Sequence, residues 1–305
     1  MRIGVVGAGG IGGYFGGRLA QAGADVHFLA RGAQLTALRE RALRVRSIRG
    51  DFEVRVAATD DPAAIGPCEI VLFCVKSFDT EAAAAALPPL LGAETGVLSL
   101  QNGVDNEEKL VAAISDVHVL AGAAYVLAFV AEPGVIEHVG GPGLIAFGEL
   151  DGRRSERAER LLECCERAGI RAELDPNIHA LLWDKLAFIC AQAGMTAACR
   201  LPIGSIRANP ETWRMFRQID AEVVALAEAE GVHLSAETVD RHAAFAERLE
   251  PESTSSLHHD LAHGRRLELE ALHGFVVRRA RERQVQVPAC EAVYAVLAPW
   301  ENGGP

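Results

Sequence analysis

A lysine in an apolar helical stretch is the first residue whose type suggests chemistry. Lys185 lies between Leu182 and Phe188, where every other residue except Asp184 is apolar. An ammonium beside a ketone oxygen stabilises the negative charge that develops as hydride attacks, and it can supply the proton. Partial burial near Trp183 would favour release of that proton near neutral pH. The alternative is a lysine on a helix edge whose ammonium stays in solvent. The pattern favours a general acid.

The N-terminal segment predicts a binding site for a hydride donor. A short apolar run from Ile3 to Val6 leads into a G-x-G-x-x-G sequence, and an alanine- and leucine-bearing helical stretch follows. This order is the dinucleotide fingerprint, whose helix N-terminus offers N–H groups to phosphate. The alternative is a glycine-rich structural turn. The predicted cofactor-binding residues of this loop are Gly7, Gly9, Gly10, Ile11 and Gly12.

Polar residues follow three further predicted strands. Arg31 ends the strand 26–30, where no Asp or Glu stands. A basic residue there accommodates the 2′-phosphate of NADP, so NADP is the predicted cofactor, with a solvated loop arginine as the alternative. Lys76 and Asn102 follow the strands 69–75 and 95–100. Carboxyl ends of parallel strands share one edge of a sheet, so both should lie near the glycine loop. A plain turn is the alternative for Asn102-Gly103.

The succession of elements divides the chain into two domains. Strand signals largely cease after Asp175-Pro176, and periodic helical patterns follow. We therefore expect an α/β fold with an N-terminal Rossmann-type doubly wound domain, residues 1–176, and an all-helical C-terminal domain, residues 177–305. The first should carry a small antiparallel insertion at 43–56 and a hairpin turn at 140–143, between strands 117–130 and 134–148. Helices are expected at 178–199, 210–230, 235–249, 254–283 and 288–299.

Composition excludes several classes of partner. The formal net charge of −11 argues against nonspecific binding to nucleic acid or anionic membranes. Neither a signal segment nor an apolar run of about 18 residues is present, which favours a cytoplasmic protein. The seven cysteines are scattered without a C-x-x-C pair and are expected to be reduced thiols. His258, His259 and His263 have no third ligand at zinc-like spacing, so no metal is expected. The stripe from Trp213 to Leu226 predicts helical core or a subunit interface.

Taken in order, these motifs resemble the ketopantoate reductase (2-dehydropantoate 2-reductase) family. The resemblance covers essentially the whole chain. It implies an oxidoreductase of pantothenate biosynthesis, in which NADPH reduces a 2-oxo acid to the 2-hydroxy acid in a cleft between the domains of a homodimer. The residues that carry it are the glycine loop, Arg31, Lys76, Asn102-Gly103, Trp183 to Leu186, Ser255-Ser256, Glu268 and the run Gly274 to Ala280.

The same resemblance implies roles for single residues. Lys185 matches the catalytic lysine that donates the proton, and Glu268 the family's catalytic glutamate. Lys76 and Asn102 match residues on the cofactor side, with Asn102 also near substrate, and Ser256 matches a substrate-binding serine.

Glu268 also fits an ordinary salt-bridged face, because Arg265, Arg266 and Glu270 surround it. Helical spacing from Leu261 to Phe275 instead predicts that its carboxylate faces inward. On one straight helix, Ser256 and Glu268 would lie roughly 18 Å apart and could not both touch one small substrate. Either they contact different parts of the cofactor and substrate pair, or the helix bends near Gly264.

Three substrate positions depart from the family. Ile189, Ala193 and Ser253 stand where the family has asparagines, and Gln192 is the nearest amide. Lys185, Ile189 and Ala193 share one helix face, so we expect a bulkier or less polar substrate tail than that of ketopantoate. Two alternatives remain: a catalytically silent NADP-binding sensor or regulatory protein on the same fold, and an opine-type reductive aminase.

Overall fold

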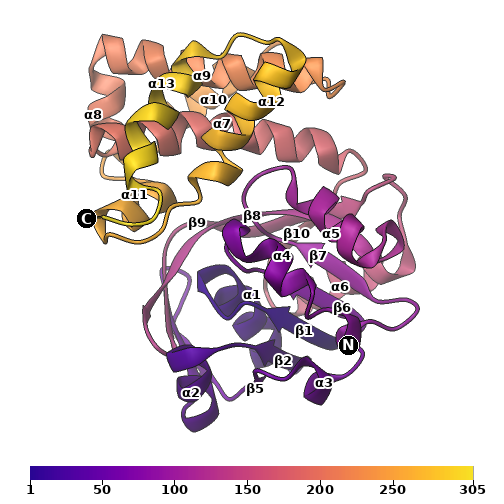
Figure 1. Cartoon of the computed structure of the whole chain (residues 1–305). Helices are drawn as coiled ribbons and strands as arrows, with labels where there is room; N and C mark the ends of the chain where they lie inside the picture. The colour runs from indigo at the N-terminus through magenta and orange to yellow at the C-terminus, as the bar shows by residue number, and fades with distance from the viewer. Residues whose placement is uncertain (305) are drawn as a thin grey trace. The chain divides into compact units, whose positions relative to one another are not determined.

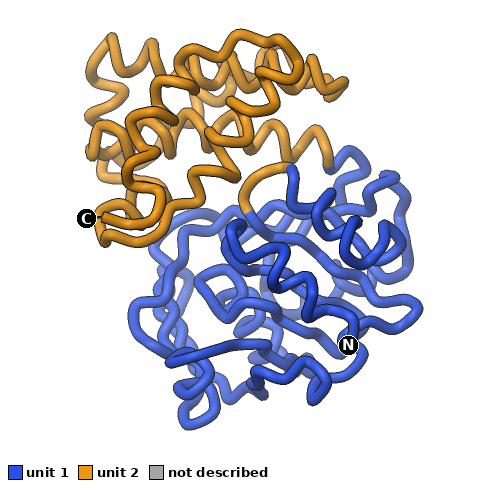
Figure 2. Tube along the Cα trace, viewed as in Figure 1, with its two compact units in different colours: residues 1–101, 105–178 blue, residues 102–104, 179–305 orange. Residues whose placement is uncertain are grey.

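The computed structural model describes residues 1–304, and the chain forms two compact units (Figure 2). Unit 1 holds Met1–Gln101 and Asp105–Ile178. Unit 2 holds the residues from His179 onward together with Asn102–Val104. This three-residue segment is flanked on both sides by unit 1, and no sequence motif indicates that it belongs to the helical unit.

Unit 1 is built on one sheet whose strands run in the order β4-β3-β9-β8-β7-β6-β1-β2-β5 (Figure 1). The β5-β2-β1-β6-β7-β8 half is wholly parallel, as expected of a Rossmann-type fold. The predicted insertion is the antiparallel pair β3–β4. The strands are β1 (Arg2–Val6), β2 (Asp25–Leu29), β3 (Leu43–Ser47), β4 (Phe52–Val54), β5 (Ala57–Thr59), β6 (Ile70–Phe73), β7 (Gly96–Ser99), β8 (Val119–Glu132), β9 (Val135–Glu149) and β10 (Arg171–Leu174).

Both faces of the sheet are buried at its centre, which is why β6 and β7 are continuous apolar runs. Along β6, Ile70 and Leu72 join one core cluster, whereas Val71 and Phe73 join the cluster on the other face. α1 and α6 cover the first face, and α3, α4 and α5 cover the second. The helices of unit 1 are α1 (Gly10–Gln21), α2 (Gly32–Glu40), α3 (Pro62–Ile65), α4 (Thr80–Ala84), α5 (Asn106–Ile114) and α6 (Glu156–Arg167), with 3-10 turns η1 (Ser77–Asp79), η2 (Pro88–Leu90) and η3 (Asp116–His118).

The predicted hairpin turn at 140–143 is wrong. The chain reverses between Glu132 and Val135, where Gly134 has a φ of 83°, and residues 140–143 lie inside β9. There the register against β8 shifts, and a Cβ on Gly141 would lie 3.0 Å from the Tyr125 carbonyl oxygen. These glycines form a bulge that bends β9, so its first half pairs with β3 and its second half with β10.

Unit 2 consists of helices arranged around α7 (Ile178–Cys199), as predicted. The stripe along α9 is core, because Phe216, Ile219, Val223 and Leu226 are fully buried. α8 was not predicted. None of the helices in residues 1–304 is long and apolar enough to cross a membrane. The other helices are α8 (Ile203–Ala208), α9 (Pro210–Ala229), α10 (Thr238–Arg248), α11 (Ser256–Ala262), α12 (His273–Arg283) and α13 (Pro288–Leu297), with 3-10 turns η4 (Leu269–Ala271) and η5 (Ala298–Trp300).

The single helix expected at 254–283 is also wrong. α11 ends before Gly264, which has a φ of 62°, and α12 begins only at His273. The backbone N–H of Leu267 donates to the Glu301 carbonyl, so the intervening loop bonds to the C-terminal segment instead of continuing the helix. Ser256 and Glu268 therefore do not share a straight helix, and the separation of about 18 Å expected along such a helix does not apply.

Candidate functional site

The glycine loop has the geometry that a dinucleotide requires. A Cβ on Gly7, whose φ is 100°, would lie 2.8 Å from the Val75 backbone nitrogen, and one on Gly12 would lie 2.1 Å from the Gly7 carbonyl oxygen. Gly10 packs in the same way against Ala128 of β8. Gly9 precedes α1 and has nothing within 4 Å of its Cβ position. Open space before a helix N-terminus is where the pyrophosphate of a dinucleotide fits.

Arg31 lies just past the end of β2 and precedes α2. Its side chain is 81% exposed and its Nη2 lies 2.6 Å from Oδ2 of Asp79, at the end of η1. Because it is exposed, the guanidinium can turn toward an incoming phosphate. To do so, it must break its ion pair with the Asp79 carboxylate. Ile11, on the first turn of α1, is half-buried.

Hydrogen bonds fix the loop that carries Lys76. Gln101 Nε2 donates to the Val75 carbonyl at 3.0 Å and to Thr80 Oγ1 at 2.8 Å. Thr80 Oγ1 in turn donates to the Ser77 carbonyl at 2.8 Å. Lys76, between these anchors, is half-buried. The carboxyl ends of β6 and β7 are therefore held together on the edge that the sequence predicts for the cofactor.

Lys185 and Asn102 meet within unit 2. Lys185 Nζ donates to Asn102 Oδ1 at 3.4 Å, and both side chains are half-buried. Asn102 lies three residues past the end of β7 and belongs to the short segment that packs with the helical unit. The Trp183 ring packs on that of Phe275 in α12, with ring centroids 5.8 Å apart. This contact anchors the part of α7 that carries Lys185. An ammonium pointed at an amide oxygen in a half-buried position can bind a ketone oxygen by the same geometry.

The remaining predicted residues lie in unit 2 but at different depths. Glu268 is buried, which contradicts the solvated salt-bridged face, and it directly precedes η4. Ile189 is half-buried one turn beyond Lys185, whereas Ala193 belongs to the apolar core. Ser253 and Ser256 are half-buried.

Ser255, rather than Ser256, is the serine that ties α11 to α7. Its Oγ lies 2.9 Å from Thr196 Oγ1, and it accepts from the His258 backbone N–H at the start of α11. Ser256 remains next to this anchor as the first residue of the helix.

A group of four charged side chains beside Lys185 was not predicted. His242 Nδ1 lies 3.0 Å from both carboxylate oxygens of Asp220, and its Nε2 lies 3.3 Å from Asp184 Oδ2. Arg241 also donates to Asp184. We call Asp184, Asp220, Arg241 and His242 the charged quartet. A signal was present in the sequence, because Asp220 falls on the same apolar stripe as Phe216 and Val223.

The charged quartet predicts a loss of stability in alkali. Burial alone would lower the pKa of His242, but the hydrogen bonds to Asp184 and Asp220 outweigh it and raise the pKa to about 9, from 6.5. Because the folded-state value is the higher one, the stabilisation is complete below about pH 6.5 and is lost as pH rises through about 9. The free energy of unfolding should fall by on the order of 3 kcal/mol over this interval. Urea titrations at several pH values measure it, and a His242→Gln variant that showed the same decline would contradict this assignment.

Other features narrow the chemistry. Among residues 1–304, no group of three or more His, Cys, Asp or Glu side chains is placed to hold a metal ion. The seven cysteines are free thiols. Lys76, Lys109 and Lys185 are the three lysines among 30 basic residues. Two of the three lysines thus stand at predicted site positions. This scarcity of lysine is a further sequence signal for the roles predicted for Lys76 and Lys185.

Comparison with known proteins agrees with this arrangement. Residues 3–152 match the family model described as "Ketopantoate reductase PanE/ApbA", and residues 177–301 match that of its C-terminal part. A 2-dehydropantoate 2-reductase of Archaeoglobus fulgidus is 34% identical, with 99% of each chain covered. The crystal structure of a PanE/ApbA family ketopantoate reductase from Ralstonia eutropha is 34% identical and superposes with a TM-score of 0.90, over 99% of this chain and 98% of that one.

A more distant structure shares the fold alone. It is named as D-mandelate dehydrogenase with NADH and anilino(oxo)acetate, and it is 20% identical with a TM-score of 0.90, over 99% of this chain and 98% of that one. The closer matches span both units and establish the family. The chain belongs to the ketopantoate reductase family and is an oxidoreductase of the 2-dehydropantoate 2-reductase type, which reduces a 2-oxo acid with a nicotinamide cofactor.

Proposed function

We propose that this protein uses NADPH to reduce ketopantoate or a related 2-oxo acid, with Lys185 as the general acid. The observation that carries the proposal is the bond from Lys185 Nζ to Asn102 Oδ1. The nicotinamide supplies the hydride when the cofactor is bound. Lys185 then takes the substrate's ketone oxygen as its acceptor, stabilises the alkoxide and transfers its proton to it. Glu268, buried on the loop before η4, orients the substrate or the ammonium.

The tail of the substrate is the second part of the proposal. Ile189 follows Lys185 by one turn and offers a branched hydrocarbon where the family has an amide. A pocket that lacks hydrogen-bond partners for a hydroxyl loses most of its discrimination in favour of one. We therefore infer a substrate with a bulkier or less polar tail than ketopantoate.

A screen of NADPH oxidation with 2-oxo acids of graded tail size and polarity tests both parts. Ketopantoate must be included, as must aryl 2-oxo acids, because a protein of the same fold is named for mandelate. A strong preference for ketopantoate would refute the inference from Ile189. Absence of turnover with every acid would favour the NADP-binding sensor, and strict dependence on an added amine would favour the aminase. A homodimer stays a prediction for light scattering to test.

The choice of NADPH over NADH should depend on Arg31. Arg31→Ala removes a charge-assisted hydrogen bond to the 2′-phosphate, so KM for NADPH should rise about 10- to 100-fold while KM for NADH changes little. Arg39→Ala is the matched control, because Arg39 is also exposed on α2 and pairs with Asp60. Equal KM changes for both cofactors would contradict the assignment of Arg31.

A further inference from the structure

The charged quartet is joined to Lys185 through the residue before it on α7. Asp184 is the nearest carboxylate to Lys185 along the chain, and its oxygens accept from His242 of α10 and from the neighbouring Arg241. Asp220 of α9 is fully buried and closes the group on the far side of the imidazole. Three helices, α7, α9 and α10, thus contribute to one ionic cluster one residue from the proposed acid.

The geometry fixes the charge of His242. Both ring nitrogens face carboxylates, and only the imidazolium can donate from both. The groups that face the ring are Asp184 and Phe188 from α7 and Asp220 from α9, and the Phe188 ring meets it edge-on at 5.4 Å. With Arg241, the quartet has two positive and two negative members and is neutral. Against burial, which lowers it, the same two carboxylates raise the pKa of His242 to about 9.

This neutrality has a consequence for the lysine. Adjacent residues of a helix point in different directions, so Asp184 turns to α10 while Lys185 Nζ reaches Asn102 Oδ1. An uncompensated carboxylate at position 184 would attract the ammonium and hold its proton more tightly. Here that charge is already matched by Arg241 and His242.

We propose that Asp220 and His242 are positioning residues for the reaction, which hold Asp184 against α10 within a group whose charges sum to zero, so that Asp184 does not pair with Lys185 and the ammonium faces the ketone oxygen. The inference rests on the proposed role of Lys185 as general acid. Neither residue touches substrate; both act through Asp184. The quartet also fixes the rotation of α7, because the carboxylate of Asp184 and the ring of Phe188 hold His242 from the same helix face.

Two substitutions with opposite charge effects separate this role from a purely structural one. Asp184→Asn leaves the quartet with a net positive charge, so Lys185 should lose its proton at lower pH. His242→Gln leaves it net negative, so Lys185 should hold its proton to higher pH. A change of one charge in the quartet should move the pH midpoint of the Lys185 titration by roughly 0.5 to 1 pH unit. The double variant His242→Gln, Asp220→Asn removes one charge of each sign and should return the midpoint to the wild-type value.

The midpoint is read from 15N-lysine NMR of the full-length protein with NADP bound. The chain has only three lysines, so Lys76 and Lys109 serve as internal references. Because the proposed general acid must be protonated, the alkaline limb of the kcat profile should move with the Lys185 signal. Arg217→Gln is the control, because Arg217 and Asp240 form an exposed ion pair between the same helices α9 and α10.

Opposite shifts in the two single variants, restored in the double variant, support the proposal. Lowered melting temperatures with an unmoved Lys185 midpoint in every variant would overturn it and leave the quartet a stability element. The NMR readout does not depend on turnover, and the Lys185→Ala assay described below tests the catalytic role separately. A failure of the proposed function is thereby distinguished from a failure of this inference.

Discussion

Replacing Lys185 with alanine is expected to lower kcat by roughly 10²- to 10⁴-fold, the usual contribution of a positioned proton donor. Lys185 Nζ donates to Asn102 Oδ1 at 3.4 Å, and the proposed mechanism assigns this ammonium to the ketone oxygen of the substrate. The residues proposed to bind the cofactor, namely the glycine loop, Arg31 and Lys76, do not include Lys185. The Kd for NADPH, measured by fluorescence titration, should therefore change by less than about twofold to threefold.

Lys185→Arg sharpens the comparison. A guanidinium keeps the positive charge but does not release its proton in the assay range, so this variant should retain electrostatic stabilisation without proton donation. Its kcat should fall between those of the wild type and Lys185→Ala. Circular dichroism and melting temperature verify the fold of each variant. Unchanged turnover in Lys185→Ala, with NADPH still oxidised, would falsify the proposed mechanism.

The parts of the fold that follow from local pattern were predictable. β1, β6 and β7 are apolar on both faces, and such runs are typical of strands in parallel sheets. The fingerprint at Gly7, Gly9 and Gly12 specifies a turn that other residues could not adopt, because backbone atoms of Val75 and Gly7 occupy the Cβ positions of Gly7 and Gly12. The apolar runs and the glycine spacing are local features of the sequence, so they were visible without the rest of the structure.

The two incorrect predictions arose where distant segments decide the conformation. The glycines at 140–143 predict a turn, but in the structure they admit the close approach of Tyr125 and Tyr14 to β9. Gly264 ends α11 because the loop after it bonds to Glu301, far along the chain. Turn and helix signals measure local preference, and tertiary hydrogen bonds override them.

The site divides in the same way. Lys185 and Asn102 could be selected from residue type and strand order, and the structure brings them together in unit 2. His242 and Asp220 could not be connected to Lys185, because the contact requires α7, α9 and α10 to be packed on one another. The sequence points to Ser256, and only the packing of α11 on α7 identifies its neighbour Ser255 as the residue that joins the two helices.

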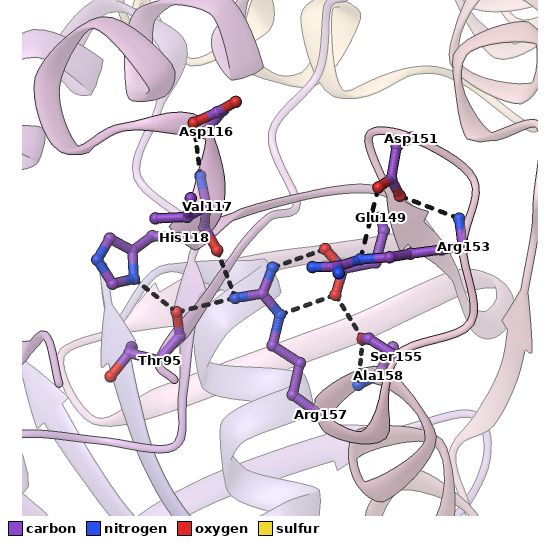
Figure 3. Close-up of polar contacts among 10 residues, drawn as sticks. All are labelled: Thr95, Asp116, Val117, His118, Glu149, Asp151, Arg153, Ser155, Arg157 and Ala158. Carbon is purple, nitrogen blue, oxygen red and sulfur yellow. Dashed lines mark hydrogen bonds and ion pairs between the residues drawn. The ribbon is translucent and has the colours of Figure 1, made fainter. Parts of the chain in front are cut away.

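Replacement of Arg157 is expected to have the largest effect on stability. Arg157 lies at the amino end of β7, whereas the predicted cofactor edge lies at the carboxyl ends of the strands. Arg157 forms a two-pronged ion pair with Glu149, with Nε to Oε1 at 2.8 Å and Nη2 to Oε2 at 2.6 Å. Its Nη1 also donates to the carbonyls of Val117 and Thr95 (Figure 3). Thr95 directly precedes β7, whereas Asn102 follows it. The ion pair therefore joins β9, α6 and the amino end of β7, away from the cofactor edge.

Removal of the arginine strands a buried carboxylate. The Glu149 side chain is 4% exposed and that of Arg157 14%. Burial opposes ionisation of Glu149, yet the hydrogen bonds from Arg157 and Ser155, together with the Arg157 and Arg153 charges, outweigh burial and lower the pKa of the carboxyl. Arg157→Ala should thus reduce the free energy of unfolding by about 3 to 5 kcal/mol at pH 7, measured by urea denaturation. The matched control is Arg154→Ala, whose exposed ion pair with Glu159 should contribute less than about 1 kcal/mol.

The predicted cause of the stability loss in Arg157→Ala is the unpaired Glu149 carboxylate rather than lost packing. The pH dependence of stability distinguishes these two causes. The wild type loses the stabilisation by Glu149 as pH falls through the lowered pKa, whereas the buried carboxyl of Arg157→Ala takes up a proton at higher pH. The stability difference should therefore narrow in acid. The double variant Glu149→Gln, Arg157→Met, which has no charge to strand, should recover at least half of the loss. If the stability difference were the same at every pH and in the double variant, the effect would be assigned to packing. The kcat of the folded enzyme should be unchanged in every variant, because the cluster lies at the amino end of β7.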